Sequence, residues 1–301
     1  MASLFQSYPL QRLKSIASDK KTTRFAITAA AGAFIGSVIG YQFGGGPASS
    51  FIGGIFSVSA WDACVGIGIG SAIAWVQSAY LRNTASRNRN VIRTGLRCAL
   101  GGAAGGVRLV LTKSMLGGGF GHVVGWTMEG LVMGWLLAPV FPNMPRKPAA
   151  IGGLLAGFLG GLVGPILWPM FGTALGIAVA DSLKGLFLAA MLTIAEKFQA
   201  ISDGSLIVHW GPKEQSTILL GEDPIAIGSD PKCQIYLKRE NESHPPIVAE
   251  IVQTDGKTVL HDRKNNKTTD LPDGTVVNIG TLKIEVRAGI HLSALQKAQK
   301  S

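Results

Sequence analysis

The chain has 301 residues, of which 47% are hydrophobic and only 15% are charged, with 40 glycines and a mean hydropathy of +0.31. This composition is too apolar and too poor in charge for an ordinary soluble globular protein, and it predicts a membrane protein. The net charge of +10 does not indicate nucleic-acid binding, because the basic residues cluster beside apolar runs, where anionic lipid and membrane topology explain them.

Residues 1–24 mix apolar and basic side chains. A secretory signal would have a short basic region followed directly by an apolar core, whereas here a long polar segment comes first. We expect an amphipathic segment that lies on the anionic cytoplasmic face of the membrane and contacts lipid.

Six apolar runs follow, at about 25–45, 54–80, 98–116, 119–141, 148–170 and 173–196. Each is close to the roughly 20 residues that cross about 30 Å of hydrocarbon. The runs predict about six transmembrane helices in a domain over 25–197. Glycine and alanine weaken the first and third runs, so four or five spans remain open.

The basic residues between the runs predict the topology. Five arginines lie between the second and third runs, and Arg146 and Lys147 lie between the fourth and fifth. The links after the first and fifth runs carry no Lys or Arg. The positive-inside rule then places both termini in the cytoplasm, in a multi-pass protein of the inner (plasma) membrane with three helical hairpins.

The three hairpins resemble one another and predict an internal repeat over about 25–81, 93–142 and 146–196. Each opens with a glycine-rich helix, at 32–40, 101–106 and 153–164, and each second helix carries an acidic residue just before a glycine: Asp62, Glu129 and Asp181. In lipid, small residues let neighbouring backbones approach closely. Because this holds between chains as well as within one, a second copy of the chain is a candidate partner.

Among the charged residues inside the apolar runs are Asp62, Arg108, Glu129, Asp181 and Lys184. A helix rises 1.5 Å per residue, so Arg108 and Glu129 each lie about 15 Å into the membrane, counted from the start of their apolar runs. An ion pair between them is therefore geometrically allowed. Asp181 and Lys184 are three apart on one helix face and can neutralise each other, whereas Asp62 has no obvious partner. Asp62, Glu129 and Asp181 either line a path for cations or protons, or fix helix packing and register.

After residue 197 the pattern changes to short β-branched runs separated by turn residues. Eight runs predict strands, at 205–209, 217–220, 225–227, 234–237, 247–252, 258–261, 275–278 and 281–286. We expect a compact all-β sandwich over 205–288, followed by a basic tail over 289–301.

The stretch IAIGSDPKCQIYL at 225–237, the segment IVAEI at 247–251 and LPDGTVVNIGTLKIEV at 271–286 resemble a forkhead-associated (FHA) domain. The resemblance covers roughly 205–288. It implies a cytoplasmic β-sandwich that binds a protein partner through loops corresponding here to Gly228, Ser229, Pro245, Pro246, Asn265 and Asn266. Such domains typically recognise phosphothreonine.

This chain departs from the FHA pattern where phosphate would be bound. Ser229 replaces an arginine, Pro245, Pro246 and Val248 replace the Ser, Arg and His of a signature, and Asn265 and Asn266 replace an Asn-Gly turn. Without the arginine a phosphate loses its bidentate partner. A phosphorylated partner is therefore less favoured than a sandwich used for other protein contacts.

No pattern predicts an enzyme, a cofactor or a metal site. GxSxG, HExxH and P-loop motifs are absent, and Cys64, Cys98 and Cys233 lack zinc or disulfide spacing. The sequence predicts a membrane-anchored adaptor whose FHA-like sandwich recruits a cytoplasmic protein. The alternative is a channel or transporter with intramembrane acidic residues, regulated by the sandwich.

Overall fold

The computed structural model describes residues 20–44, 50–211, 214–237, 245–254, 257–263, 265–280 and 282–289. Most of the expected amphipathic segment and nearly all of the basic tail lie outside these residues. The chain divides into two compact units. The helical unit comprises Met1–Val76, Val91–Ala138 and Arg146–Lys197, and the β unit comprises Gln77–Asn90, Pro139–Pro145 and Phe198–Ser301.

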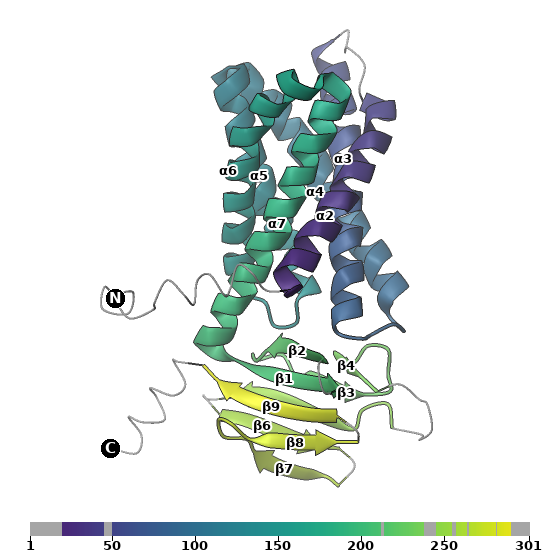
Figure 1. The fold of residues 1–301 in the computed structure, drawn as a ribbon, viewed down its shortest axis with the longest axis vertical. Coiled ribbons are helices and arrows are strands. Elements are labelled where there is room, and N and C mark those ends of the chain that lie inside the picture. Colours follow the sequence, from purple (N-terminus) through teal and green to yellow (C-terminus); the bar gives the residue numbers. More distant parts are fainter. Residues whose placement is uncertain are drawn as a thin grey trace, which may run out of the picture. The chain divides into compact units, whose positions relative to one another are not determined.

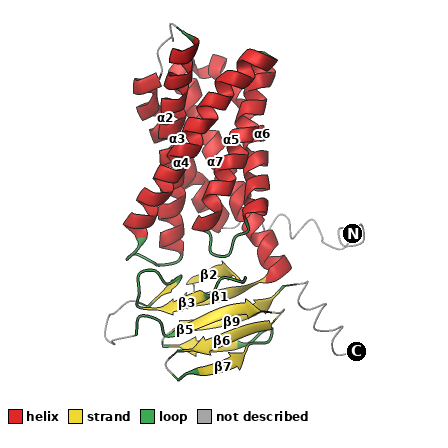
Figure 2. Cartoon of the chain, turned by 180° about the vertical axis from the view of Figure 1, so that it is seen from behind, coloured by secondary structure: helices red, strands yellow, loops and turns green. Residues whose placement is uncertain are grey.

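Six long helices occur among the described residues (Figures 1 and 2). They are α2 (Lys20–Gly44), α3 (Phe51–Tyr80), α4 (Arg87–Leu116), α5 (Gly118–Leu137), α6 (Arg146–Phe171) and α7 (Thr173–Asp203), with a short 3-10 helix η2 (Ala138–Val140) after α5. Each contains most or all of one of the six apolar runs.

Five of these helices are long and apolar enough to cross a membrane, which fits a membrane protein. The exception is α4, because four arginines lie in its first three turns and Arg108 and Lys113 follow. Large apolar side chains such as Phe43, Phe56 and Phe120 are exposed on the helices, as expected of a surface that faces lipid.

Glycine allows close contact between particular helices. A Cβ atom on Gly130 of α5 would overlap the carbonyl oxygen of Gly153 on α6, and one on Gly153 would overlap that of Gly130. Gly32 of α2 and Gly68 of α3 face each other in the same way. These contacts have the backbone-to-backbone character expected of small residues between helices in lipid, while the threefold repeat stays a prediction.

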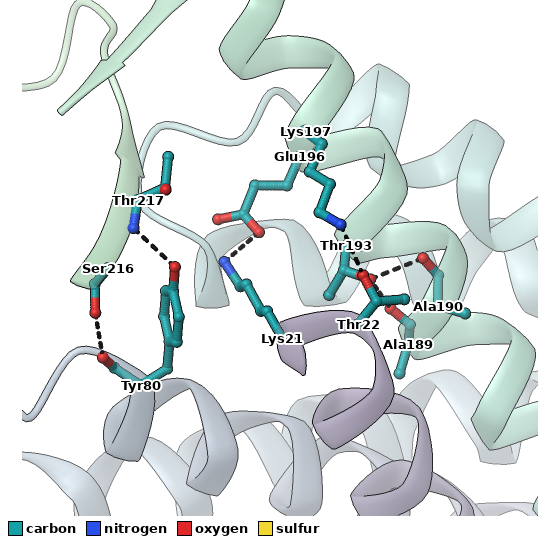
Figure 3. Close-up of polar contacts among 10 residues, drawn as sticks. All are labelled: Lys21, Thr22, Tyr80, Ala189, Ala190, Thr193, Glu196, Lys197, Ser216 and Thr217. Carbon is teal, nitrogen blue, oxygen red and sulfur yellow. Dashed lines mark hydrogen bonds and ion pairs between the residues drawn. The ribbon is translucent and has the colours of Figure 1, made fainter. Parts of the chain in front are cut away.

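Polar contacts join the first turn of α2 to α7 (Figure 3). Lys21 Nζ lies 2.5 Å from Glu196 Oε2, with both side chains buried. Lys197 Nζ donates to Thr22 Oγ1 at 3.1 Å. The start of one helix is therefore fixed against a segment about 175 residues away in sequence.

The β unit contains two sheets. The four-stranded sheet has the order β2-β1-β9-β8 and is antiparallel throughout: β2 (Glu214–Leu219), β1 (Gly204–Gly211), β9 (Leu282–Ala288) and β8 (Val276–Ile279). The five-stranded sheet has the order β4-β3-β5-β6-β7: β4 (Ile235–Tyr236), β3 (Ile225–Gly228), β5 (Ala249–Thr254), β6 (Lys257–Asp262) and β7 (Lys267–Asp270). In it only β3 and β4 pair in parallel.

Both sheets contribute to one hydrophobic core. Alternate residues of the strands point inward, as a period of two requires, and include Leu206, Val208, Ile227, Ile251 and Ile284. The sequence did not predict β7, because all four of its residues are exposed and it has no apolar alternation.

The β unit also includes connections between helices. Leu81, just after α3, belongs to its hydrophobic core. Thr217 N donates to Tyr80 Oη at 2.8 Å, and Ser216 Oγ donates to the Tyr80 carbonyl at 2.6 Å (Figure 3). Asn143 Nδ2 donates to the carbonyls of Leu219 and Asp223. Three separate chain segments therefore build this unit.

Candidate functional site

Three loops converge at one end of the five-stranded sheet. Strand β3 pairs antiparallel with β5, and β5 pairs antiparallel with β6. The end of β3, the start of β5 and the end of β6 therefore lie at the same end of the sheet. Backbone bonds join the loops: Ser229 N donates to the Pro245 carbonyl at 3.3 Å, and Arg263 N to the Val248 carbonyl at 3.0 Å. We define the loop face as Gly228, Ser229, Pro245, Pro246, Asn265 and Asn266.

Ser229 is buried within the loop face. It is only 8% exposed, and its Oγ donates to the Pro245 carbonyl at 3.2 Å. A Cβ atom on Gly228 would overlap the Pro246 carbonyl, so the two loops pack backbone against backbone. The position where a phosphate-binding arginine would stand is thus occupied by a short, inward-facing hydroxyl.

Arg263, the basic residue of the β6–β7 loop that the structure describes, is already paired. Nε and Nη2 of Arg263 donate to Glu250 Oε2 at 2.9 and 2.5 Å. This pairing neutralises the guanidinium that would otherwise attract a phosphate. The described part of the loop face therefore lacks a free bidentate cation.

The turn at Asn265 and Asn266 is exposed and polar. Asn265 donates from its backbone N to Asp262 Oδ1 at 3.0 Å and from Nδ2 to Asp262 Oδ2 at 2.7 Å. Asn266 has φ 48°, in the left-handed region that asparagine tolerates better than most residues. The Asp262 contacts fix the turn and leave the Asn266 side chain available to a partner.

Asn83 holds the loop that follows β3. Its Nδ2 donates to the carbonyls of Pro231 at 3.1 Å and Cys233 at 2.9 Å, and its Oδ1 accepts from Ser86 N. Sequence reasoning missed this contact, because Asn83 lies 150 residues before Cys233 and resembles an ordinary helix-start residue.

Cys233 is buried beside the loop face. Its Sγ lies 3.5 Å from the Pro246 carbonyl, and burial raises the pKa of its thiol. The thiolate, which is the nucleophilic form, is therefore depleted at neutral pH. This cysteine has the character of a packing residue.

In the helical unit the acidic residues gather around Lys184. Its Nζ lies 2.6 Å from Glu129 Oε1, with each side chain only 2% exposed, and 4.8 Å from the centroid of the Trp126 ring. The sequence allowed Arg108 as a partner for Glu129 and Asp181 as a partner for Lys184, and the ion pair in the structure joins Glu129 to Lys184. A Cβ atom on Gly105 of α4 would overlap the Glu129 side chain, so α4 and α5 are neighbours, and similar depth alone does not specify which charged side chains pair.

The other two acids face the same centre. Asp181 Oδ2 accepts from Ser37 Oγ at 2.8 Å. Asp62 lies close enough to Glu129, Lys184, Asp181 and Lys113 to interact with them electrostatically. Asp62 Oδ2 is buried and has no hydrogen-bond partner among the described residues, and the same holds for Arg108 Nη1.

No group of three or more His, Cys, Asp or Glu side chains in the described ranges could hold a metal ion. A scan against protein-family models gives no match, and comparisons with curated proteins and with solved structures give none either. Any function is therefore inferred from the chemistry of the loop face and of the cluster around Lys184.

Proposed function

We propose that this protein is a membrane-anchored adaptor whose FHA-like sandwich recruits a protein partner through the loop face. The observation that carries the proposal is the convergence of three loops at one end of the five-stranded sheet. Loops on a rigid sheet scaffold are where binding residues are most often found.

The chemistry of the loop face favours a partner without phosphate. Ser229 is buried and Arg263 is paired with Glu250, so a doubly charged phosphate would meet no free guanidinium among the loop residues that the structure describes. The exposed Asn265–Asn266 turn presents amides, which donate and accept hydrogen bonds from a peptide backbone equally well.

The helical unit serves as the anchor in this proposal. Five helices have the length and composition of membrane spans, and glycine contacts such as Gly130 with Gly153 pack them closely. The arginine-rich start of α4 and the pair Arg146 and Lys147 support placing these helix ends, the sandwich and both termini on the cytoplasmic side of the plasma membrane.

The test uses the full chain in lipid nanodiscs, incubated with lysate with and without phosphatase. Asn266→Gly keeps the left-handed backbone and removes only the amide side chain, so we expect it to abolish capture of the partner. The matched control is Lys283→Ala, at an exposed position of β9 in the other sheet. Lys283→Ala and phosphatase should both leave capture unchanged.

Equal capture by the wild type and Asn266→Gly would contradict binding through the loop face. Capture that phosphatase abolishes would contradict the phosphate-independent part of the proposal and restore phosphothreonine recognition.

A further inference from the structure

Basic and apolar side chains lie beside each other on the first half of α4, within the helical unit. We propose that Arg93, Arg97 and Arg146 bind the phosphate group of an anionic phospholipid in the cytoplasmic leaflet. The acyl chains of this lipid pack against exposed apolar residues of α4, which are Ile92, Leu96 and Leu100. The inference uses the membrane placement proposed above and is independent of partner capture.

Two kinds of side chain share one side of α4. Ile92, Leu96 and Leu100 are spaced four residues apart, so they form one row, and all three are exposed. Arg93, which is exposed, and Arg97, which is half-buried, each follow one of these residues in sequence. At about 3.6 residues per turn, the five residues lie within less than half of the helix circumference. An apolar row next to basic residues is typical of a helix segment at the boundary between acyl chains and headgroups.

The helices α5 and α6 bring another basic group to the same level. A Cβ atom on Gly101 of α4 would lie 2.7 Å from Leu136 Cδ1 of α5, so these two residues are level with each other. Arg97 is four residues before Gly101, on the same row and about one turn nearer the start of α4. Arg146 Cζ lies 4.5 Å from the centroid of the ring of Trp135, the residue before Leu136. Arg97 and Arg146 are therefore within about one helical turn of the same level.

The charge at this level is positive and uncompensated by protein. The thirty residues of α4 include no Asp or Glu, and neither does the segment 130–150. Among the described residues, no carboxylate forms an ion pair with Arg93, Arg97 or Arg146. Guanidinium groups match phosphate oxygens in bidentate geometry.

The surroundings indicate a lipid phosphate and not a soluble one. Trp135 is 44% exposed, and tryptophan is enriched at the boundary between membrane and water, where lipid phosphates lie. Basic residues between helix ends on the cytoplasmic side are the pattern that binds anionic headgroups. The exposed apolar row of α4 offers acyl chains a surface that inorganic phosphate could not use.

The first test is native mass spectrometry of the full chain in an uncharged detergent, titrated with phosphatidylglycerol or with phosphatidylcholine of the same acyl chains. Each arginine near an anionic headgroup contributes about fivefold in affinity. We therefore expect the wild type to bind phosphatidylglycerol at least about tenfold more tightly than phosphatidylcholine. Inorganic phosphate should not displace the bound lipid, because it lacks acyl chains.

Arg93→Gln combined with Arg97→Gln should weaken binding of phosphatidylglycerol at least about tenfold and leave binding of phosphatidylcholine unchanged. The matched control combines Arg24→Gln with Lys283→Gln, which removes the same charge from exposed positions of α2 and β9 and should keep the wild-type preference. An equal loss in both double variants would mean that only net charge matters and would overturn the site. Equal binding of the two lipids by the wild type, or displacement by inorganic phosphate, would overturn it as well. The assay contains no lysate, so its failure is distinguishable from failure of partner capture.

A second measurement uses the wild type alone, in case the arginine variants fail to fold. Phosphatidylglycerol with a photoreactive diazirine at the glycerol end of one acyl chain labels the residues that it contacts, and peptide mass spectrometry locates the label. We expect label on residues 92–100 that excess unlabelled phosphatidylglycerol removes and phosphatidylcholine does not. Absence of label there, or equal removal by both lipids, would contradict the site.

Discussion

Lys184 determines how charge is arranged inside the helical unit. It is almost fully buried, lies 2.6 Å from Glu129 Oε1 and contacts the face of the Trp126 ring. A buried ammonium is tolerated only where anions compensate it. Glu129 is paired directly with Lys184, so removing either side chain leaves the other as a buried charge without its closest partner.

Glu129→Gln should lower the free energy of unfolding by about 3–5 kcal/mol, because it leaves Lys184 buried without its closest anion. The double variant Glu129→Gln with Lys184→Met should lose less than the sum of the single losses. Denaturant unfolding of the full chain in detergent measures the free energy of unfolding of the wild type, the single variants and the double variant. Arg108→Met is the comparison and should couple to Glu129→Gln less strongly than Lys184→Met does. A larger coupling of Glu129 with Arg108 than with Lys184 would contradict the pairing.

At the scale of elements, glycine positions decide which helices can approach. Along α5, Gly130 and Gly134 face the backbone of α6, whereas Gly118 and Gly119 in its first turn meet nothing within 4 Å. The same residue type therefore has two different roles in one helix. Only Gly130 and Gly134 bring the backbones of α5 and α6 into contact.

Gly130→Ala should destabilise the helical unit by about 1–3 kcal/mol, since its Cβ would overlap the carbonyl oxygen of Gly153. Gly119→Ala should be neutral or stabilising by up to about 1 kcal/mol, because alanine is the better helix former and the space is open. Thermal unfolding of both variants in nanodiscs gives the comparison. A Gly130→Ala variant as stable as Gly119→Ala would exclude the close α5–α6 contact.

At the scale of the whole molecule, the β unit is not a simple C-terminal domain. Its core includes Leu81, and its strands and loops bond to Tyr80 at the end of α3 and to Asn83 and Asn143 between helices. The helical connections are thus structural parts of the unit that carries the loop face. A fragment of 198–301 lacks every one of these contacts.

We expect an isolated 198–301 fragment to be much less stable than the β unit of the full chain. In the full chain, Leu81→Ala should cost about 2–5 kcal/mol, the usual loss for a buried leucine. Hydrogen exchange of the β1 and β2 amides reports this loss directly. Leu96→Ala, at an exposed position of α4, should leave that exchange unchanged. Full protection in the fragment would show that 198–301 folds by itself.

Local features of the fold were predictable because they depend on neighbouring residues. The apolar run at 54–80 predicted α3 (Phe51–Tyr80) within three residues, and the run at 25–45 predicted α2 (Lys20–Gly44) within five. Where hydropathy and helix formation differ, prediction failed: α4 begins at Arg87, although its apolar run begins near residue 98. Arginine interrupts an apolar run but favours a helix.

The sequence by itself determined the two kinds of structure and the positions of most helices and strands, because periodicity and turn chemistry act over a few residues. Only the tertiary structure decided that Lys184 pairs with Glu129, that Asn83 holds the loop after β3, and that Leu81 enters the β core. These contacts join residues 55 to 150 or more positions apart. Which distant segments become neighbours depends on how whole helices and sheets pack, and no local pattern records that choice.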